Sequence, residues 1–311
     1  MADIKKVATR ESYGNALKEC GAKYDILVLD ADLSKSTKTD VFKKAYPERF
    51  INCGIAEANM MCTAAGLASC GRTVFASSFA MFAAGRAFEQ IRNSICYPNL
   101  PVKIVASHAG ITVGEDGATH QCLEDLAIMR SLPNMVVINP ADDTETKKAV
   151  EAAINYNGPV YIRVGRAAVP VVFDESYNFE IGKGVTVKDG NDITLIGTGI
   201  MVNEAMVAAE KLAEKGISAR VINIATLKPI DKDIIIKAAK ETKGIVTCEE
   251  HNINGGLGSA VAEVLCENAP AKMARIGTKD VFGASGKPAE LMDAYEISAD
   301  HIVKAAEELL K

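Results

Sequence analysis

The stretch Val102-Lys-Ile-Val-Ala-Ser107, continued by His108-Ala-Gly-Ile-Thr-Val-Gly-Glu-Asp-Gly-Ala-Thr-His120, joins a short β-branched run to a polar loop punctuated by glycines. A run of this length predicts a strand. Similar short strand patterns alternate with helical patterns along the whole chain. Such alternation predicts an α/β fold in which mainly parallel sheets carry helices on both faces.

The predicted elements divide the chain into two units. Strands are expected at 26–30, 73–76, 102–107, 135–139, 160–164, 193–197, 220–224 and 244–248. Helices are expected near 9–22, 57–70, 79–96, 121–131, 141–156, 201–215, 231–243, 257–267 and 298–310. The polar, glycine-containing stretch after Pro170 interrupts this alternation. We therefore expect two doubly wound domains, 1–175 and 191–311, joined by a linker at 176–190.

The composition excludes several classes of function. The 311 residues are 48% apolar, enough for two cores, and the net charge of −5 leaves no general basic surface for nucleic acid. The longest uncharged stretch, Ala58–Gly71, has fourteen residues, whereas a membrane-spanning helix needs about twenty. The first residues lack the apolar core of a signal peptide, so we expect a cytoplasmic protein.

The eight cysteines form no Cys-x-x-Cys pair and are expected to be reduced and mostly buried.

Ligands of doubly wound sheets bind beyond the carboxyl ends of the strands, so the loops after the strands are the candidate sites. Four such loops in the first unit are rich in polar residues. They are 30–37, 52–57, 108–120 and 163–166.

Each candidate residue, in these loops or just after the strand expected at 73–76, has a structural alternative to a functional role. Glu57 opens a helical pattern, where an acidic side chain also complements the helix dipole. Phe79 and Phe82 have the spacing of helical core residues as well as that of a ligand platform. The loop 108–120 holds two histidines and two carboxylates. These side chains suit either a metal ion or the hydroxyl groups of a carbohydrate or carbonyl substrate.

Several segments, in order, give the chain a resemblance to the C-terminal half of transketolases. The resemblance covers essentially the whole chain. The segments are Ala8-Thr-Arg10, Ala31-Asp-Leu-Ser-Lys-Ser36, Gly54-Ile-Ala-Glu57-Ala-Asn-Met60, Ser77-Ser-Phe79, Ser107-His108, Gly114-Glu-Asp-Gly-Ala-Thr-His-Gln121, Pro133-Asn-Met135, Gly165-Arg166 and Leu227-Lys-Pro-Ile-Asp231. The resemblance implies a pyrimidine-binding domain for thiamine diphosphate, followed by a Rossmann-like C-terminal domain.

The resemblance also implies residue roles. Glu57 would bind the pyrimidine ring nitrogen of the cofactor, and Phe79 and Phe82 would line the pyrimidine face. The residues that would bind the sugar phosphate are Arg10, Ser36, His108 and Arg166, while Asp116 and His120 would contact substrate hydroxyls, His120 as a catalytic residue. Arg163 is expected to form a structural salt bridge. His251 is expected to be either a site residue or a residue of the surface or of an interface.

The chain departs from the family pattern at Ala56, Ala58, Gly85 and Ala118, which affects the expected pocket shape. Arg86 and the segment Glu249–Gly256 resemble more closely the deoxyxylulose-phosphate synthases and the beta subunits of 2-oxo acid dehydrogenases. Those two activities, and a non-catalytic protein of the same fold, remain alternatives.

The sequence lacks the Gly-Asp-Gly element and following Asn with which this superfamily holds Mg²⁺ and the diphosphate. We therefore assign no metal ligand to this chain and expect an N-terminal subunit to carry that site. The expected enzyme is a split transketolase, a dimer of heterodimers that transfers a ketol unit between sugar phosphates in the pentose phosphate pathway.

Overall fold

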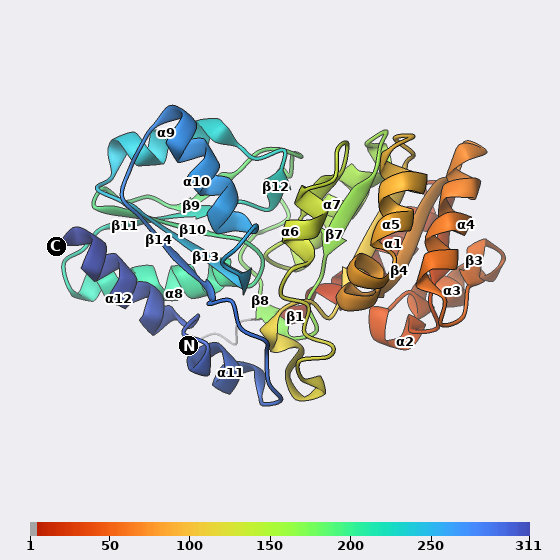
Figure 1. The fold of residues 1–311 in the computed structure, drawn as a ribbon, viewed down its shortest axis with the longest axis horizontal. Helices are drawn as coiled ribbons and strands as arrows, with labels where there is room; N and C mark the ends of the chain where they lie inside the picture. The colour runs from red at the N-terminus through yellow and green to blue at the C-terminus, as the bar shows by residue number, and fades with distance from the viewer. Residues whose placement is uncertain (1–4) are drawn as a thin grey trace.

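The computed structural model describes residues 5–311 and has two α/β lobes that lie side by side (Figure 1). The first lobe is built on a seven-stranded sheet with the order β12-β6-β7-β5-β4-β2-β3, and the second on a five-stranded sheet with the order β14-β13-β10-β11-β9. Most strand pairs are parallel, and helices cover both faces of each sheet. The predicted α/β architecture with two mainly parallel sheets is confirmed.

The strands of the first sheet are β2 (Ile26–Asp30), β3 (Phe50–Asn52), β4 (Thr73–Phe79), β5 (Val102–Ser107), β6 (Val136–Ile138), β7 (Val160–Arg163) and β12 (Thr226–Lys228). Those of the second are β9 (Val185–Lys188), β10 (Ile193–Gly197), β11 (Ala219–Asn223), β13 (Ile245–Asn252) and β14 (Met273–Thr278). A separate antiparallel pair joins β1 (Lys6–Ala8) to β8 (Ala168–Pro170).

The helices of the first lobe are α1 (Thr9–Gly21), α2 (Ser34–Thr37), α3 (Asp40–Ala45), α4 (Glu57–Ser69), α5 (Phe88–Gln90), α6 (Asp125–Arg130) and α7 (Asp143–Asn155). Those of the second are α8 (Met201–Glu214), α9 (Lys232–Glu241), α10 (Leu257–Asn268), α11 (Pro288–Ala294) and α12 (Ala299–Leu310). Short 3₁₀ turns are η1 (Pro47–Arg49) and η4 (Ile111–Asp116), and η2 (Met81–Arg86) and η3 (Ile91–Cys96) are π-helical turns.

The second half of the chain contributes to the first sheet. Strand β12 returns to pair antiparallel with β6 at the sheet edge, Thr226 opposite Ile138. Strand β9, inside the segment expected as a linker, pairs antiparallel with β11. The sequence did not predict either strand, because short edge strands with one neighbour need little apolar sequence.

Two other local expectations were wrong. The helix expected at 79–96 is broken, since β4 continues to Phe79 and the π-helical turns flank a single turn of helix. Cys20, Cys96, Cys122 and Cys248 are buried as expected, but Cys62, Cys70 and Cys266 are exposed. Cys62 and Cys70 lie in the uncharged stretch 58–71, so the sequence around them carries too weak a polar pattern to reveal which face is buried.

Within residues 5–311, no helix has the length and apolar content needed to cross a bilayer.

Candidate functional site

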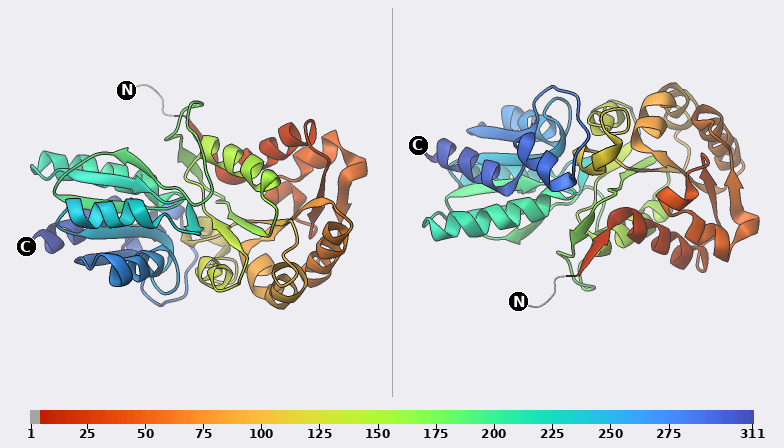
Figure 2. Two further views of the ribbon diagram at one scale, coloured as in Figure 1. Left: turned by 90° about the horizontal axis from the view of Figure 1, so that it is seen from above. Right: turned by 90° about the horizontal axis from the view of Figure 1, so that it is seen from below.

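The expected site residues come from the segments that follow β2, β4, β5 and β7 and from the first turns of α1 and α4. Because β4, β5 and β7 are neighbours in one parallel sheet, their carboxyl ends lie together. Figure 2 shows that the segment around residues 110–130, drawn in yellow, lies between the two lobes.

Glu57 is the first residue of α4, and only 1% of its surface is exposed. One of its carboxylate oxygens, Oε2, accepts a hydrogen bond from Arg86 Nη1 at 2.9 Å. The other, Oε1, lies 3.5 Å from Ser78 Oγ. A buried carboxylate with one strong partner and one long contact has capacity for a further hydrogen bond at Oε1.

Four aromatic rings form a cluster next to this carboxylate. The rings of Phe79 and Phe82 stack with centroids 5.9 Å apart, and the His108 ring stacks on Phe79 at 3.8 Å. The His120 ring is in edge-to-face contact with both phenylalanines, with its centroid 5.4 Å from that of Phe82 and 6.2 Å from that of Phe79. The structure thus brings the two phenylalanines together with both histidines of the 108–120 loop.

Arg86 connects Glu57 to this aromatic cluster. Its guanidinium lies over the Phe82 ring, with Cζ 4.6 Å from the ring centroid, while Nη1 forms an ion pair with Glu57. A planar group that donates hydrogen bonds therefore fits between the ring and the carboxylate. An aminopyrimidine is also planar and polar at its edge, so these residues fit the pyrimidine part of thiamine diphosphate. Since half of the Arg86 side chain is exposed, it has room to move away.

The two expected phosphate-binding arginines differ in their surroundings. Arg10 Nη1 donates to the backbone oxygen of Ser36 at 3.0 Å and approaches His108 Nε2 at 3.3 Å. Arg166 pairs with Glu115 at 2.7 Å and also donates to the Val113 carbonyl. Arg10, Ser36 and His108 are thus joined, although Ser36 takes part through its carbonyl and not its hydroxyl.

His108 is buried and electrostatically constrained. Burial, followed by the positive charges of Arg10 and Arg166, lowers the pKa of His108 from 6.5 to about 3. Its Nδ1 lies 2.9 Å from Ser107 Oγ. The ring is therefore neutral at physiological pH, and its Nε2 is available as an acceptor for Arg10 or for a substrate hydroxyl.

Asp116 is not joined to this group. It ends η4, is exposed, and its carboxylate forms no hydrogen bond or ion pair with any residue in 5–311. The neighbouring His120 forms a local contact with Thr119 at 2.9 Å.

Arg163 and His251 are buried polar residues outside the group of expected substrate residues. Arg163 forms an ion pair with Asp125 at 3.0 Å, with both side chains buried, which confirms its expected structural role. His251 is fully buried, so a surface role is wrong, and its Nε2 accepts from Ala127 N of the first lobe at 3.4 Å. His251 is therefore part of the contact between the lobes.

The sequence reasoning missed the contacts of Ser78 and Arg86 with Glu57. The spacing of four residues between Phe82 and Arg86 indicated only that these two side chains could meet, and no pattern indicated the contact with Glu57.

Comparisons with known proteins decide the family. The model described as "Transketolase, pyrimidine binding domain" matches residues 5–171, and "Transketolase, C-terminal domain" matches 182–302. The chain belongs to the transketolase family. It contains the pyrimidine-binding and C-terminal domains of that family, which depends on thiamine diphosphate.

Two relatives and one solved structure illustrate the similarity. A transketolase C-terminal section from Methanocaldococcus jannaschii is 54% identical over 306 residues, covering 97% of this chain and 96% of that protein. The 6-deoxy-6-sulfo-D-fructose transketolase subunit SqwH from a Clostridium species is 41% identical over 301 residues, covering 96% and 94%. A solved structure described as a split gene transketolase, inactive beta4 tetramer, is 52% identical with a TM-score of 0.91, covering 98% of this chain and 99% of that one.

The chain is shorter than the animal transketolases to which it is similar. It covers 49% of the human transketolase, to which it is 40% identical over 310 residues. This chain is similar in length to the C-terminal section and the SqwH subunit, and to about half of a complete animal transketolase.

Proposed function

We propose that this chain is one subunit of a hetero-oligomeric, thiamine-diphosphate-dependent transketolase that transfers a two-carbon ketol unit from a ketose phosphate to an aldose phosphate. The observation that carries the proposal is the buried Glu57 carboxylate beside Phe82, with the planar guanidinium of Arg86 between them. This arrangement supports recognition of a planar, hydrogen-bonding ring.

Bound thiamine diphosphate would supply the acidic ring carbon that accepts and later releases the two-carbon unit. Glu57 would hold a proton between its carboxylate and the pyrimidine ring nitrogen, with Phe79 and Phe82 excluding water from the ring face. Oε1 would carry that proton, because Oε2 accepts a hydrogen bond from Arg86. A guanidinium needs the carboxylate as an acceptor, whereas the ring nitrogen needs a donor.

The substrate would lie toward His108 and His120. Neutral His108 would accept a hydrogen bond from a hydroxyl, and Arg10 and Arg166 would bind the terminal dianion. We retain Asp116 and Ser36 as proposed substrate residues. Their side chains are free to turn toward a ligand, since Asp116 is exposed and Ser36 is half-buried.

We propose that an N-terminal subunit supplies the Mg²⁺ and diphosphate site and that two such pairs assemble. The similarity to the structure described as a split gene transketolase, which covers 98% of this chain and 99% of that one, supports this division. The matched regions, a pyrimidine-binding and a C-terminal domain, support it as well. A place in the pentose phosphate pathway follows from the proposed substrates. The domain limits 1–175 and 191–311 and the cytoplasmic location remain predictions.

Reconstitution tests this function. The chain alone should show no ketol transfer, and activity should appear on mixing with a subunit that carries the Gly-Asp-Gly element, thiamine diphosphate and Mg²⁺. Xylulose 5-phosphate and ribose 5-phosphate would be the first substrates, and a 6-sulfo ketose should be compared because the SqwH subunit is named for one. Release of carbon dioxide from pyruvate would instead favour the decarboxylating alternatives. Absence of any activity, with both chains folded and associated, would contradict the proposal.

A further inference from the structure

The loop 108–120 adopts a backbone conformation that depends on support from its surroundings. Four of its residues have positive φ, with His108 at 57°, Gly110 at 85°, Gly114 at 84° and Gly117 at 75°. A left-handed conformation is costly for a residue such as histidine, and glycines are flexible in the unfolded chain. The loop must therefore be held by contacts with other elements.

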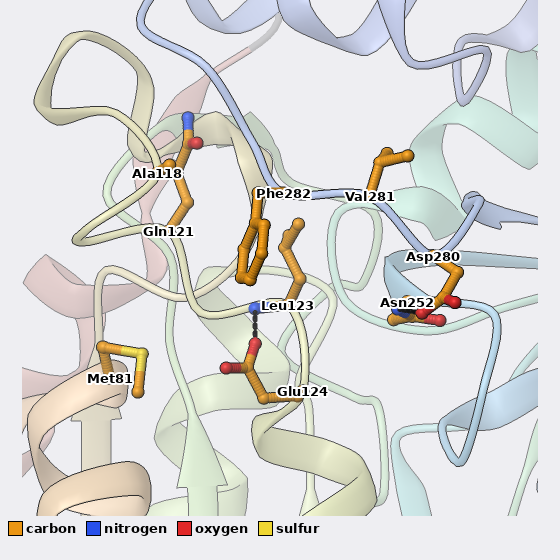
Figure 3. Close-up of a pocket in the computed structure, with 9 residues that line it drawn as sticks. All are labelled: Met81, Ala118, Gln121, Leu123, Glu124, Asn252, Asp280, Val281 and Phe282. Carbon is orange, nitrogen blue, oxygen red and sulfur yellow. Dashed lines mark hydrogen bonds between the residues drawn. The ribbon is translucent and has the colours of Figure 1, made fainter.

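Many of these contacts come from the second lobe. Gln121 Nε2, at the end of the loop, donates to the Ala284 carbonyl at 2.9 Å and to the Ile111 carbonyl at 3.0 Å. The backbone N–H of Asn252 donates to the Leu123 carbonyl at 2.7 Å. Figure 3 shows the Phe282 ring between Gln121 and Leu123, and these residues line one pocket together with Val281.

Glu250 of β13 makes the charged contact in this set. Its Oε1 accepts a hydrogen bond from the backbone N–H of Thr112 at 2.5 Å, and the side chain is buried. Gly110 packs against the same carboxylate so closely that an added Cβ would lie 2.3 Å from Glu250 Cδ. The backbone oxygen of Glu250 in turn accepts from Arg163 Nη2 at 2.9 Å. Glu250 therefore links the centre of the loop to the rigid sheet of the second lobe and to the buried Arg163.

We infer that Glu250 is a positioning residue through which the second lobe holds the loop 108–120 so that His108 and His120 face the substrate. The substrate roles of the two histidines rest on the proposed function. The ordering of the loop by Glu250 does not, and it can be measured on this chain alone.

The first experiment is hydrogen exchange on the isolated chain, comparing wild type with Glu250→Leu, Glu250→Gln and the matched control Glu249→Leu. Glu249 is also buried on β13, but its oxygens accept from Leu257 and Gly258 at the start of α10 and not from the loop. Glu250→Leu should speed exchange at amides 110–120 by about tenfold or more, since a buried donor loses a charged acceptor. Glu250→Gln keeps an acceptor oxygen and should restore most of the protection. Glu249→Leu should speed exchange near 257–260 and leave 110–120 unchanged.

The second experiment measures steady-state kinetics of the reconstituted enzyme. Glu250→Leu should raise KM for the ketose phosphate about tenfold with a smaller change in kcat, the pattern of weakened substrate binding. Glu250→Gln should lie near wild type, and Glu249→Leu should leave KM unchanged.

Equal exchange at 110–120 in Glu250→Leu and wild type would overturn the inference, as would equal loosening of that segment by Glu249→Leu. If Glu250→Leu does not fold, Glu250→Asp keeps the charge but shortens the side chain away from Thr112, and it should increase exchange in the same segment. A wild-type assembly without ketol transfer would contradict the proposed function alone, because the exchange experiment would still decide the role of Glu250.

Discussion

The Glu57 carboxylate is buried and forms an ion pair with Arg86. The Arg86 guanidinium binds one oxygen of the carboxylate in the free chain and is its counterion inside the lobe. In the proposed reaction, the carboxylate would share a proton with the pyrimidine ring nitrogen of thiamine diphosphate.

Glu57→Gln should therefore abolish most ketol transfer in the reconstituted enzyme, with kcat reduced by about 10²-fold or more, as for loss of a general acid–base group. The control is Ser78→Ala, which removes only the 3.5 Å contact and should change kcat little. Circular dichroism would check that both variants fold. Full activity of Glu57→Gln would show that the role assigned to this carboxylate is wrong.

His108 gives a prediction for pH. Its folded-state pKa, lowered to about 3, lies below the ordinary value of 6.5, so the unfolded chain binds the proton more readily. The stability that neutral His108 contributes is complete above pH 6.5 and is lost as the pH falls toward 3.

Histidine NMR on the isolated chain should show no titration of His108 between pH 5 and 8. Arg10→Ala should raise the His108 pKa, because it removes the first of the neighbouring positive charges. A His108 signal that titrates near pH 6.5 in the wild type would contradict the buried, neutral assignment.

Among the elements, α6 and β7 are joined by the buried Asp125–Arg163 pair. Tyr161 Oη also donates to Asp125 at 2.8 Å, so the carboxylate is fully engaged. Removing one partner would leave the other charge buried without its counterion.

Arg163→Met should lower the free energy of unfolding by about 3–5 kcal/mol, the range for breaking a buried ion pair. Denaturant unfolding would measure this, and the double variant Arg163→Met/Asp125→Leu should recover part of the loss. Lys211→Met, which breaks the exposed pair with Asp300, is the control and should have little effect. Equal effects of the two single variants would contradict a structural role for Arg163.

At the scale of the whole molecule, the two lobes are not independent. Strand β12 from the second half covers the edge of β6, and Glu250 and Ala284 hold the loop of the first. A fragment ending at residue 175 would leave the β6 edge unpaired, and exposed strand edges promote association.

We therefore expect residues 1–175, expressed alone, to self-associate, and co-expression with 176–311 to suppress this. Size-exclusion chromatography of the fragment, of the mixture and of the intact chain would measure the difference. A monomeric fragment with the thermal stability of the intact chain would show that the second lobe does not support the first.

Much of the fold could be predicted from sequence because buried parallel strands are short β-branched runs. The strands at 26–30, 102–107 and 193–197 were placed at their observed limits. The strands β1, β3, β8, β9 and β12 were missed, since their three or four residues carry no distinctive pattern. The six-residue edge strand β14 was missed as well, because Arg275 and Gly277 interrupt its apolar sequence. The π-helical turn at Met81–Arg86 was also missed, because its apolar sequence reads as ordinary helix.

The sequence by itself determined the α/β class, the family and the kinds of side chain available for chemistry, because these depend on residue type and order. Only the tertiary structure decided which of those side chains meet. It joined Glu57 to Arg86, stacked His108 on Phe79, and left Asp116 exposed and unpartnered within residues 5–311. It also brought Glu250, which lies more than a hundred residues further along the chain, into contact with Thr112. Such contacts depend on how two lobes pack, and no local sequence pattern encodes them.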